Sequence, residues 1–121
     1  MEKLFVYGSL TRGKRFNPLL YNWGATFITR GCVWNMDLYR QGDFHLIKPG
    51  ASRVFGELWV VPPEVIMGVD RLSGGEQGGF MREEVGFTSF GHRDSTEFPV
   101  TAYVWKRAVV PSGCLYVGSG A

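Results

Sequence analysis

The order of the short apolar runs along this 121-residue chain constrains its fold more than any other feature. Runs rich in Val, Ile, Phe, Trp and Tyr predict strands at 4–7, 25–39, 44–47, 54–61, 80–87 and 99–106. Only two segments carry helix signals, one beginning at Asn17-Pro18 and one at Pro62-Pro63-Glu64. This order lacks the regular alternation of a doubly wound sheet. It predicts an α/β (α+β) domain in which a curved mixed β-sheet or small β-barrel packs against two helices.

Glycine and proline set the expected boundaries of these elements. Gly31 interrupts the 25–39 run, which predicts either one bent strand or two successive strands. Pro49-Gly50 is expected to end the strand at 44–47. Residues 8–15 are expected to form a loop, and Asn17 is expected to cap the helix that follows it.

Composition predicts one globular domain over residues 1–121. The 17 glycines are spread along the chain, and no repeat or low-complexity tract divides it. Thirteen basic and eleven acidic side chains give a net charge of +2. This excess is small and scattered along the sequence, so no nucleic-acid partner is predicted.

Other sequence signals point to a cytoplasmic protein without a cofactor. No apolar run is long enough to span a membrane, and the amino terminus has no secretory signal pattern. Cys32 and Cys114 lie far apart, as in a reduced cytosolic pair, although a single disulfide stays open. No metal or organic cofactor is expected, and the oligomeric state is left open.

Two short motifs raise the alternative of a nucleotide-binding protein. Gly8 to Lys14 matches the phosphate-binding pattern G-x-x-x-x-G-K after a strand, but Arg15 replaces the Ser or Thr that ligates Mg²⁺. The segment from Leu72 to Gln77 is similar to the signature loop of ABC-type ATPases. The chain is short for those domains, and no later strand ends in Asp-Glu. A P-loop-like protein is therefore the weaker interpretation.

The amino-terminal residues fit a different family better. Leu4-Phe5-Val6-Tyr7-Gly8-Ser9-Leu10 resembles the V-Y-G-S-L block of γ-glutamylcyclotransferase-like proteins. Val54-Phe55-Gly56-Glu57-Leu58-Trp59 is similar to their V-x-G-E-L-Y strand, and Val69-Asp70 to the L-D at the end of a family helix. The resemblance covers nearly the whole chain. It implies release of 5-oxoproline from a γ-glutamyl amine or peptide, a small-molecule substrate whose α-amine attacks its own γ-carbonyl.

The resemblance also implies the catalytic group. Family members place a glutamate three residues after the helix-ending Asp, where this chain has Ser73. Glu76-Gln77-Gly78-Gly79-Phe80 is similar to the E-x-G-G-Y run of the ChaC-type branch, so Glu76 is predicted to be the general acid and base. One buried carboxylate with a raised pKa can take the ammonium proton and return it to the leaving amine.

The substrate-binding residues predicted from the resemblance are Tyr7, Gly8, Ser9 and Leu10. The backbone N–H groups of Gly8, Ser9 and Leu10 would hold the glutamyl α-carboxylate, with the Tyr7 ring as a wall and its hydroxyl as a donor. Glu57 is expected to make a structural hydrogen bond, and His45 is given no role. Because Ser73 occupies the usual glutamate position, a non-catalytic small-molecule-binding module on the same fold stays open.

Overall fold

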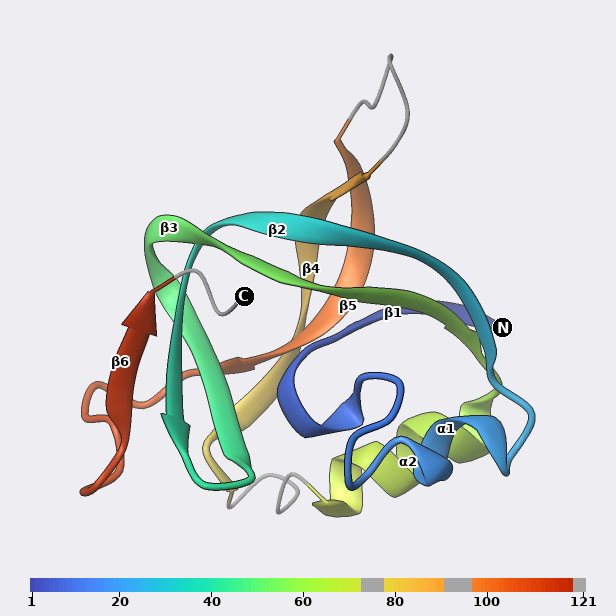
Figure 1. Ribbon diagram of the computed structural model, residues 1–121, viewed down its shortest axis with the longest axis horizontal. Coiled ribbons are helices and arrows are strands. Elements are labelled where there is room, and N and C mark those ends of the chain that lie inside the picture. The colour runs from blue at the N-terminus through green and yellow to red at the C-terminus, as the bar shows by residue number, and fades with distance from the viewer. Residues whose placement is uncertain (73–77, 91–96, 119–121) are drawn as a thin grey trace.

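A closed, mixed β-barrel forms the body of the protein, whose computed structural model describes residues 1–72, 78–90 and 97–118 (Figure 1). Around the barrel the strands follow the order β3-β1-β5-β4-β2, and β2 pairs again with β3 to close it. Only β1 and β5 run parallel, and β6 extends the sheet beside β2. The strands are β1 (Glu2–Val6), β2 (Thr26–Gln41), β3 (Phe44–Val61), β4 (Phe80–Ser89), β5 (Phe98–Trp105) and β6 (Leu115–Gly118). The predicted fold class is confirmed.

In the described part of the chain, two helices and a 3-10 turn after β1 accompany the barrel. The turn η1 (Gly8–Leu10) follows β1 directly, and α1 (Pro18–Tyr21) and α2 (Pro63–Leu72) lie together at one end of the barrel (Figure 1). The predicted second helix is confirmed, with Glu64 in its first turn and Arg71 in its last, as the helix dipole favours.

The longest strands correct the predicted boundaries. β3 continues through Pro49-Gly50, so the prediction that this pair ends a strand is wrong. Pro49, which has no N–H to donate, lies opposite Met36, next to a register shift between Trp34 and Met36 in the β2–β3 ladder. The Asp37 carboxylate lies against Gly50 and accepts the Ser52 N–H at 3.2 Å. β2 likewise runs through Gly31 as one strand, and β6 had not been predicted.

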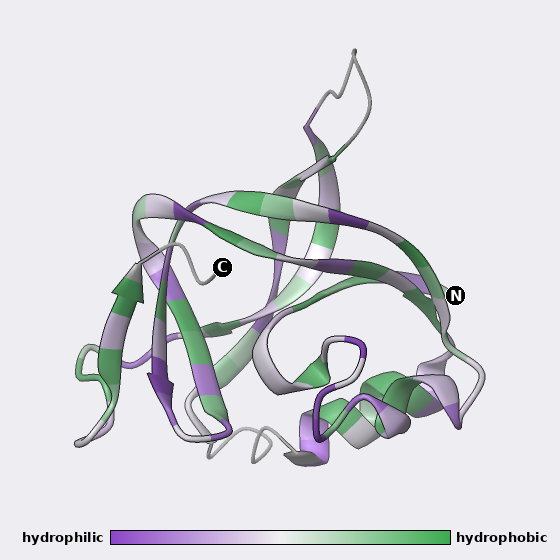
Figure 2. Cartoon of the chain, viewed as in Figure 1, coloured by the Kyte–Doolittle hydropathy of each residue, from purple (hydrophilic) through white to green (hydrophobic). Residues whose placement is uncertain are grey.

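Two hydrophobic cores divide the buried side chains. Hydrophobic and hydrophilic residues alternate along β2 and β3 (Figure 2), which directs one face of each strand into the barrel. β1 is buried on both faces: Phe5 and Tyr7 join the barrel core, whereas Leu4 and Val6 pack with the helices. The helix-facing core is completed mainly by Leu20, Trp59, Val65, Ile66, Val69 and Tyr103. The turn that follows β1 therefore begins from a fixed point between the two cores.

We expect Gly56→Ala to destabilise the barrel, because β1 and β3 approach closely at this glycine. A Cβ atom at position 56 would lie 2.2 Å from the backbone oxygen of Val6 and 2.7 Å from the Phe5 ring. Overpacking of this kind costs about 1–3 kcal/mol of unfolding free energy, measured by urea denaturation.

Gly86→Ala on β4 is the matched control. The three atoms nearest to its Cβ would all belong to the side chain of exposed Glu97, which can rotate away. Equal losses of stability in the two variants would contradict the role of the β1–β3 contact.

Candidate functional site

The turn after β1 requires glycine at its first position. Gly8 has a φ of +61°, in the left-handed region. A Cβ there would also lie 2.4 Å from Cγ of His45 on β3. The N–H groups of Gly8 and Ser9 precede the first hydrogen bond of the 3-10 turn, so the turn itself does not use them. The predicted loop thus begins with a fixed backbone shape.

A buried carboxylate holds the rest of this loop against the barrel. Glu57 on β3 is only 4% exposed. It accepts hydrogen bonds from the backbone N–H of Arg12 at 2.9 Å, from Arg12 Nε at 3.2 Å and from Trp59 Nε1 at 3.2 Å. The Arg12 guanidinium also lies over the Phe27 ring, 3.6 Å from its centre. The predicted structural role of Glu57 is confirmed.

The side chain of Asn17 fixes the other end of the turn. Asn17 is buried and donates from Nδ2 to the backbone oxygen of Leu10 at 2.8 Å. It makes no capping bond to α1, and its backbone is already helical, so the prediction that it caps the helix is wrong. The amide instead satisfies a carbonyl that the short turn leaves without a partner.

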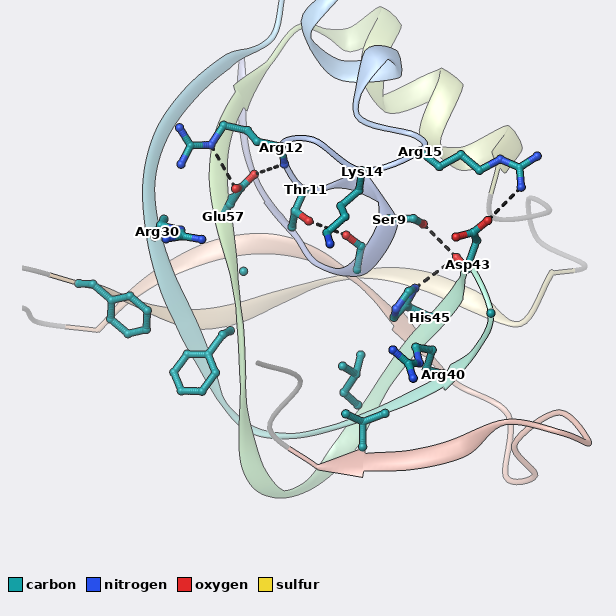
Figure 3. A pocket seen from close by; sticks show the side chains of 17 residues that line it. Ser9, Thr11, Arg12, Lys14, Arg15, Arg30, Arg40, Asp43, His45 and Glu57 are labelled. Atoms are coloured by element: carbon teal, nitrogen blue, oxygen red, sulfur yellow. Dashed lines mark hydrogen bonds and ion pairs between the residues drawn. The ribbon is translucent and has the colours of Figure 1, made fainter.

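The turn is also joined to the β2–β3 hairpin. The backbone oxygen of Asp43 accepts the Ser9 hydroxyl at 3.0 Å and Nδ1 of His45 at 3.2 Å. Arg15 pairs with the Asp43 carboxylate at 2.9 Å, as Figure 3 shows. Because a carbonyl oxygen only accepts, Nδ1 of His45 carries the proton and Nε2 is the acceptor nitrogen of the neutral ring.

A largely apolar cavity of about 360 Å³ lies beside this turn. This volume is at the lower end of the range for small-molecule sites. Tyr7, Ser9 and Leu10, three of the four predicted substrate-binding residues, line it, whereas Gly8 lines a second cavity on the other side. Further walls come from β1, the loop before α1, the β2–β3 hairpin, α2, β4 and β5, among them Phe16, Phe44, His45, Val69, Phe80 and Tyr103.

The hydroxyl group of Tyr7 is already occupied. It donates to the backbone oxygen of Tyr103 at 2.8 Å, and burial raises its pKa above the usual range, opposed by a hydrogen bond from the backbone of Ile47. Tyr7 therefore contributes its ring to the cavity wall, and the expected hydroxyl donor is directed into the structure instead.

Asp70 fixes the two elements that flank residues 73–77. The Tyr103 hydroxyl donates to the Asp70 carboxylate at 2.5 Å and to the Ile66 oxygen at 3.3 Å, which ties the end of α2 to β5. Arg82 on β4 lies 3.6 Å from the same carboxylate. Burial, followed by the Asp70 contact, raises the pKa of Tyr103 beyond its usual range. Glu76 itself lies outside the described residues.

His45 is the site residue that sequence reasoning missed. It packs against Gly8 and lines both cavities. Burial lowers its pKa, and Arg40 and Lys14 lower it further, against opposing effects of the Asp43 backbone and carboxylate. Its position directly after the hairpin turn was the only signal in the sequence. Gly8 and Lys14, which lie near it in the fold, are distant from it along the chain.

The structure does not give the Gly8–Lys14 segment the geometry of an ATPase phosphate-binding loop. In such loops the chain enters a helix whose free N–H groups hold the phosphates. Here a 3-10 turn follows β1, and the next helix begins at Pro18 and has four residues. The second ATPase-like motif ends in residues outside the described part.

Further predictions concern metals, membranes and cysteines. Across residues 1–72, 78–90 and 97–118, no group of three His, Cys, Asp or Glu side chains is placed to hold a metal ion. Within the same residues no helix has the length and apolarity to cross a membrane. Cys32 is buried and Cys114 partly exposed, and both are free thiols.

The barrel, its turn and the adjoining cavity define a small α+β domain with a candidate small-molecule site, and comparison with known proteins shows its family. Residues 4–118 match the family described as Gamma-glutamyl cyclotransferase, AIG2-like, so the chain belongs to this family. No curated protein sequence gives a significant match.

Solved structures show the same fold at low sequence identity. An AIG2-like protein from Mus musculus is 20% identical with a TM-score of 0.79, covering 93% of this chain and 82% of that one. A uropathogenic E. coli-specific protein is 21% identical with a TM-score of 0.71, covering 98% and 91%. A structure titled Gamma-glutamyl cyclotransferase is 19% identical with a TM-score of 0.66, covering 87% and 66%.

We expect Glu57→Ala to destabilise the protein, because it leaves the Arg12 amide and the Trp59 indole without their acceptor. The cost should be about 1–3 kcal/mol of unfolding free energy, measured by urea denaturation. Glu84→Ala, on an exposed position of β4, should change stability by less than about 0.5 kcal/mol. A silent Glu57→Ala would refute the anchoring role.

The lowered pKa of His45 makes stability depend on pH. In the unfolded chain His45 takes a proton near pH ~6.5, whereas the folded protein keeps it neutral to lower pH. The unfolded state then binds more protons, so the unfolding free energy should fall as pH drops below about 6.5. His45→Gln should show a smaller fall between pH 7.5 and 5.5 in urea titrations. Parallel pH dependence in the two proteins would contradict this prediction.

Proposed function

We propose that this protein is a γ-glutamylcyclotransferase that releases 5-oxoproline from a γ-glutamyl amine or peptide. The observation that supports this most is the position of the apolar cavity. Tyr7, Ser9 and Leu10 line one side, and Val69 and Phe80 line another. Val69 and Phe80 belong to the two elements that flank residues 73–77 in sequence, and membership of the cyclotransferase family supports the same activity.

In this proposal Glu76 moves the protons. Its carboxylate takes a proton from the substrate ammonium, and the freed amine attacks the γ-carbonyl carbon to form the five-membered ring. The bond from that carbon to the leaving nitrogen then breaks as Glu76 returns the proton to this nitrogen. Attack within one molecule needs orientation more than added reactivity, so a cavity that folds the glutamyl chain supplies much of the acceleration.

The turn supplies the orientation in this proposal. The N–H group of Ser9, a residue that lines the apolar cavity, binds the α-carboxylate of the glutamyl unit, and Leu10 and the Tyr7 ring pack against its methylene groups. The apolar walls exclude water, which strengthens these hydrogen bonds and raises the pKa of a carboxyl group that enters the cavity.

Glu76→Gln tests the mechanism. The amide keeps the shape but cannot accept the ammonium proton, so 5-oxoproline release should fall by about 10²–10⁴-fold. Substrate affinity should change little, because the turn is untouched. Release is measured by chromatography of 5-oxoproline from a panel of γ-glutamyl amines and peptides.

Glu84→Gln and Glu83→Gln are the controls, since Glu84 is exposed and Glu83 pairs with Lys106 at 2.6 Å. Both should keep nearly full activity, and loss in either one would move the base to that residue. Full activity of Glu76→Gln would refute the assignment. A wild-type protein that binds γ-glutamyl compounds without turning them over would be a binding module.

A further inference from the structure

A second cavity, of about 650 Å³, also adjoins the Gly8–Leu10 turn, and Figure 3 shows the side chains that line it. Its walls come from the loop 11–15 and from β2 and β3. Five basic side chains and two acidic ones line it, a net charge of +3, whereas the whole chain carries +2. The rest of the chain is therefore slightly acidic, and the positive charge that looks scattered in the sequence is gathered here.

Three of these basic side chains are unpaired within the described part of the chain. The two carboxylates are engaged, because Glu57 binds Arg12 and Asp43 binds Arg15. Lys14, Arg30 and Arg40 make no ion pair with any described residue. Lys14 and Arg40 are close enough to His45 to lower its pKa. Positive charges that lie together in a concave site focus their electric field there. Such a site favours binding of an anion.

Another part of the cavity wall is aromatic. Phe55 on β3 and Phe90, directly after β4, both line it, and their ring centres are 5.5 Å apart. The backbone N–H of Phe90 donates to the oxygen of Arg30 at 2.9 Å, so this aromatic wall is fixed next to a cationic side chain. Leu38 and Val117 add apolar surface from β2 and β6. A flat ring attached to an anionic group matches both parts of the wall.

We propose that this cavity is a second binding site, for a small aromatic or heterocyclic molecule that carries a phosphate group. Lysine and arginine side chains are the usual phosphate partners, and a phosphate monoester carries close to two charges at neutral pH. The site differs from the phosphate-binding loop of an ATPase. Here side chains from the loop 11–15 and from β2 hold the anion, whereas in an ATPase the N–H groups of a helix do so. Arg15 is bound to Asp43 and no Ser or Thr follows Lys14, so binding requires no Mg²⁺.

Calorimetric titration with phenyl phosphate, without Mg²⁺, tests the proposal on the intact chain. One molecule should bind per chain, and Lys14→Gln and Arg40→Gln should each weaken binding by about tenfold or more, as expected for a lost charge-assisted contact. Inorganic phosphate should bind more weakly than phenyl phosphate because it lacks the ring. Benzoate should bind more weakly because it carries one charge.

Lys3→Gln is the matched control, since it removes one charge from an exposed position on β1 outside both cavities. It should leave the affinity within about twofold, and circular dichroism should show all three variants folded. Equal weakening by all three variants would overturn the site, because it would reflect net charge alone. Absence of phenyl phosphate binding at millimolar concentration would also overturn it, and equally tight benzoate binding would overturn the assignment to phosphate.

Discussion

The buried carboxylate of Glu57 is the constraint on which the arrangement around the turn depends. A charged group at 4% exposure is stable only when its oxygens are hydrogen-bonded, and here the loop after the turn supplies two of the three donors. Because β3 pairs with both β1 and β2, the carboxylate is held at a fixed position in the closed barrel. The loop is therefore fastened across the barrel wall, next to a turn that adjoins both the apolar cavity and the cationic one.

The two cavities differ in chemistry although they share Ser9, Asp43 and His45. The apolar one is enclosed by residues of the helix-facing core, whereas the cationic one faces the loop 11–15 and the long hairpin. The hydrogen bonds from Ser9 and His45 to the Asp43 oxygen stiffen the partition between them. A neutral His45 suits this place, because a charged ring would add a further cation beside Lys14 and Arg40.

The sequence predicts the architecture well where local patterns decide it. The alternation in 54–61 and the periodic apolar face of Val65, Ile66 and Val69 lie where they were expected. The prediction failed at Pro49-Gly50. There the Asp37 carboxylate on β2 lies against Gly50 and accepts the backbone N–H of Ser52 on β3. Such a compensation joins residues 15 positions apart, and no rule for turns contains it.

The candidate site was predicted in part for the same reason. The motif from Tyr7 to Leu10 identifies the turn, since its glycine and strand end are local features. The engaged hydroxyl of Tyr7, the anchoring by Asn17 and the place of His45 all depend on partners brought together by barrel closure. The concentration of charge in the second cavity is likewise invisible in the sequence, because its basic residues come from the loop and from two distant parts of β2.

One feature of the barrel bears on how the chain reaches this structure. β1 lies parallel to β5, with Leu4 opposite Thr101, and the Tyr7 hydroxyl is bonded to the oxygen of Tyr103. Contacts between residues so far apart in sequence carry a high loop-closure cost and slow folding. β1 also pairs antiparallel with β3, so it can find that partner once residue 61 is made, whereas its contact with β5 needs residues 98–105 as well. The turn after β1 therefore acquires the part of its surroundings that β5 supplies only when the barrel closes.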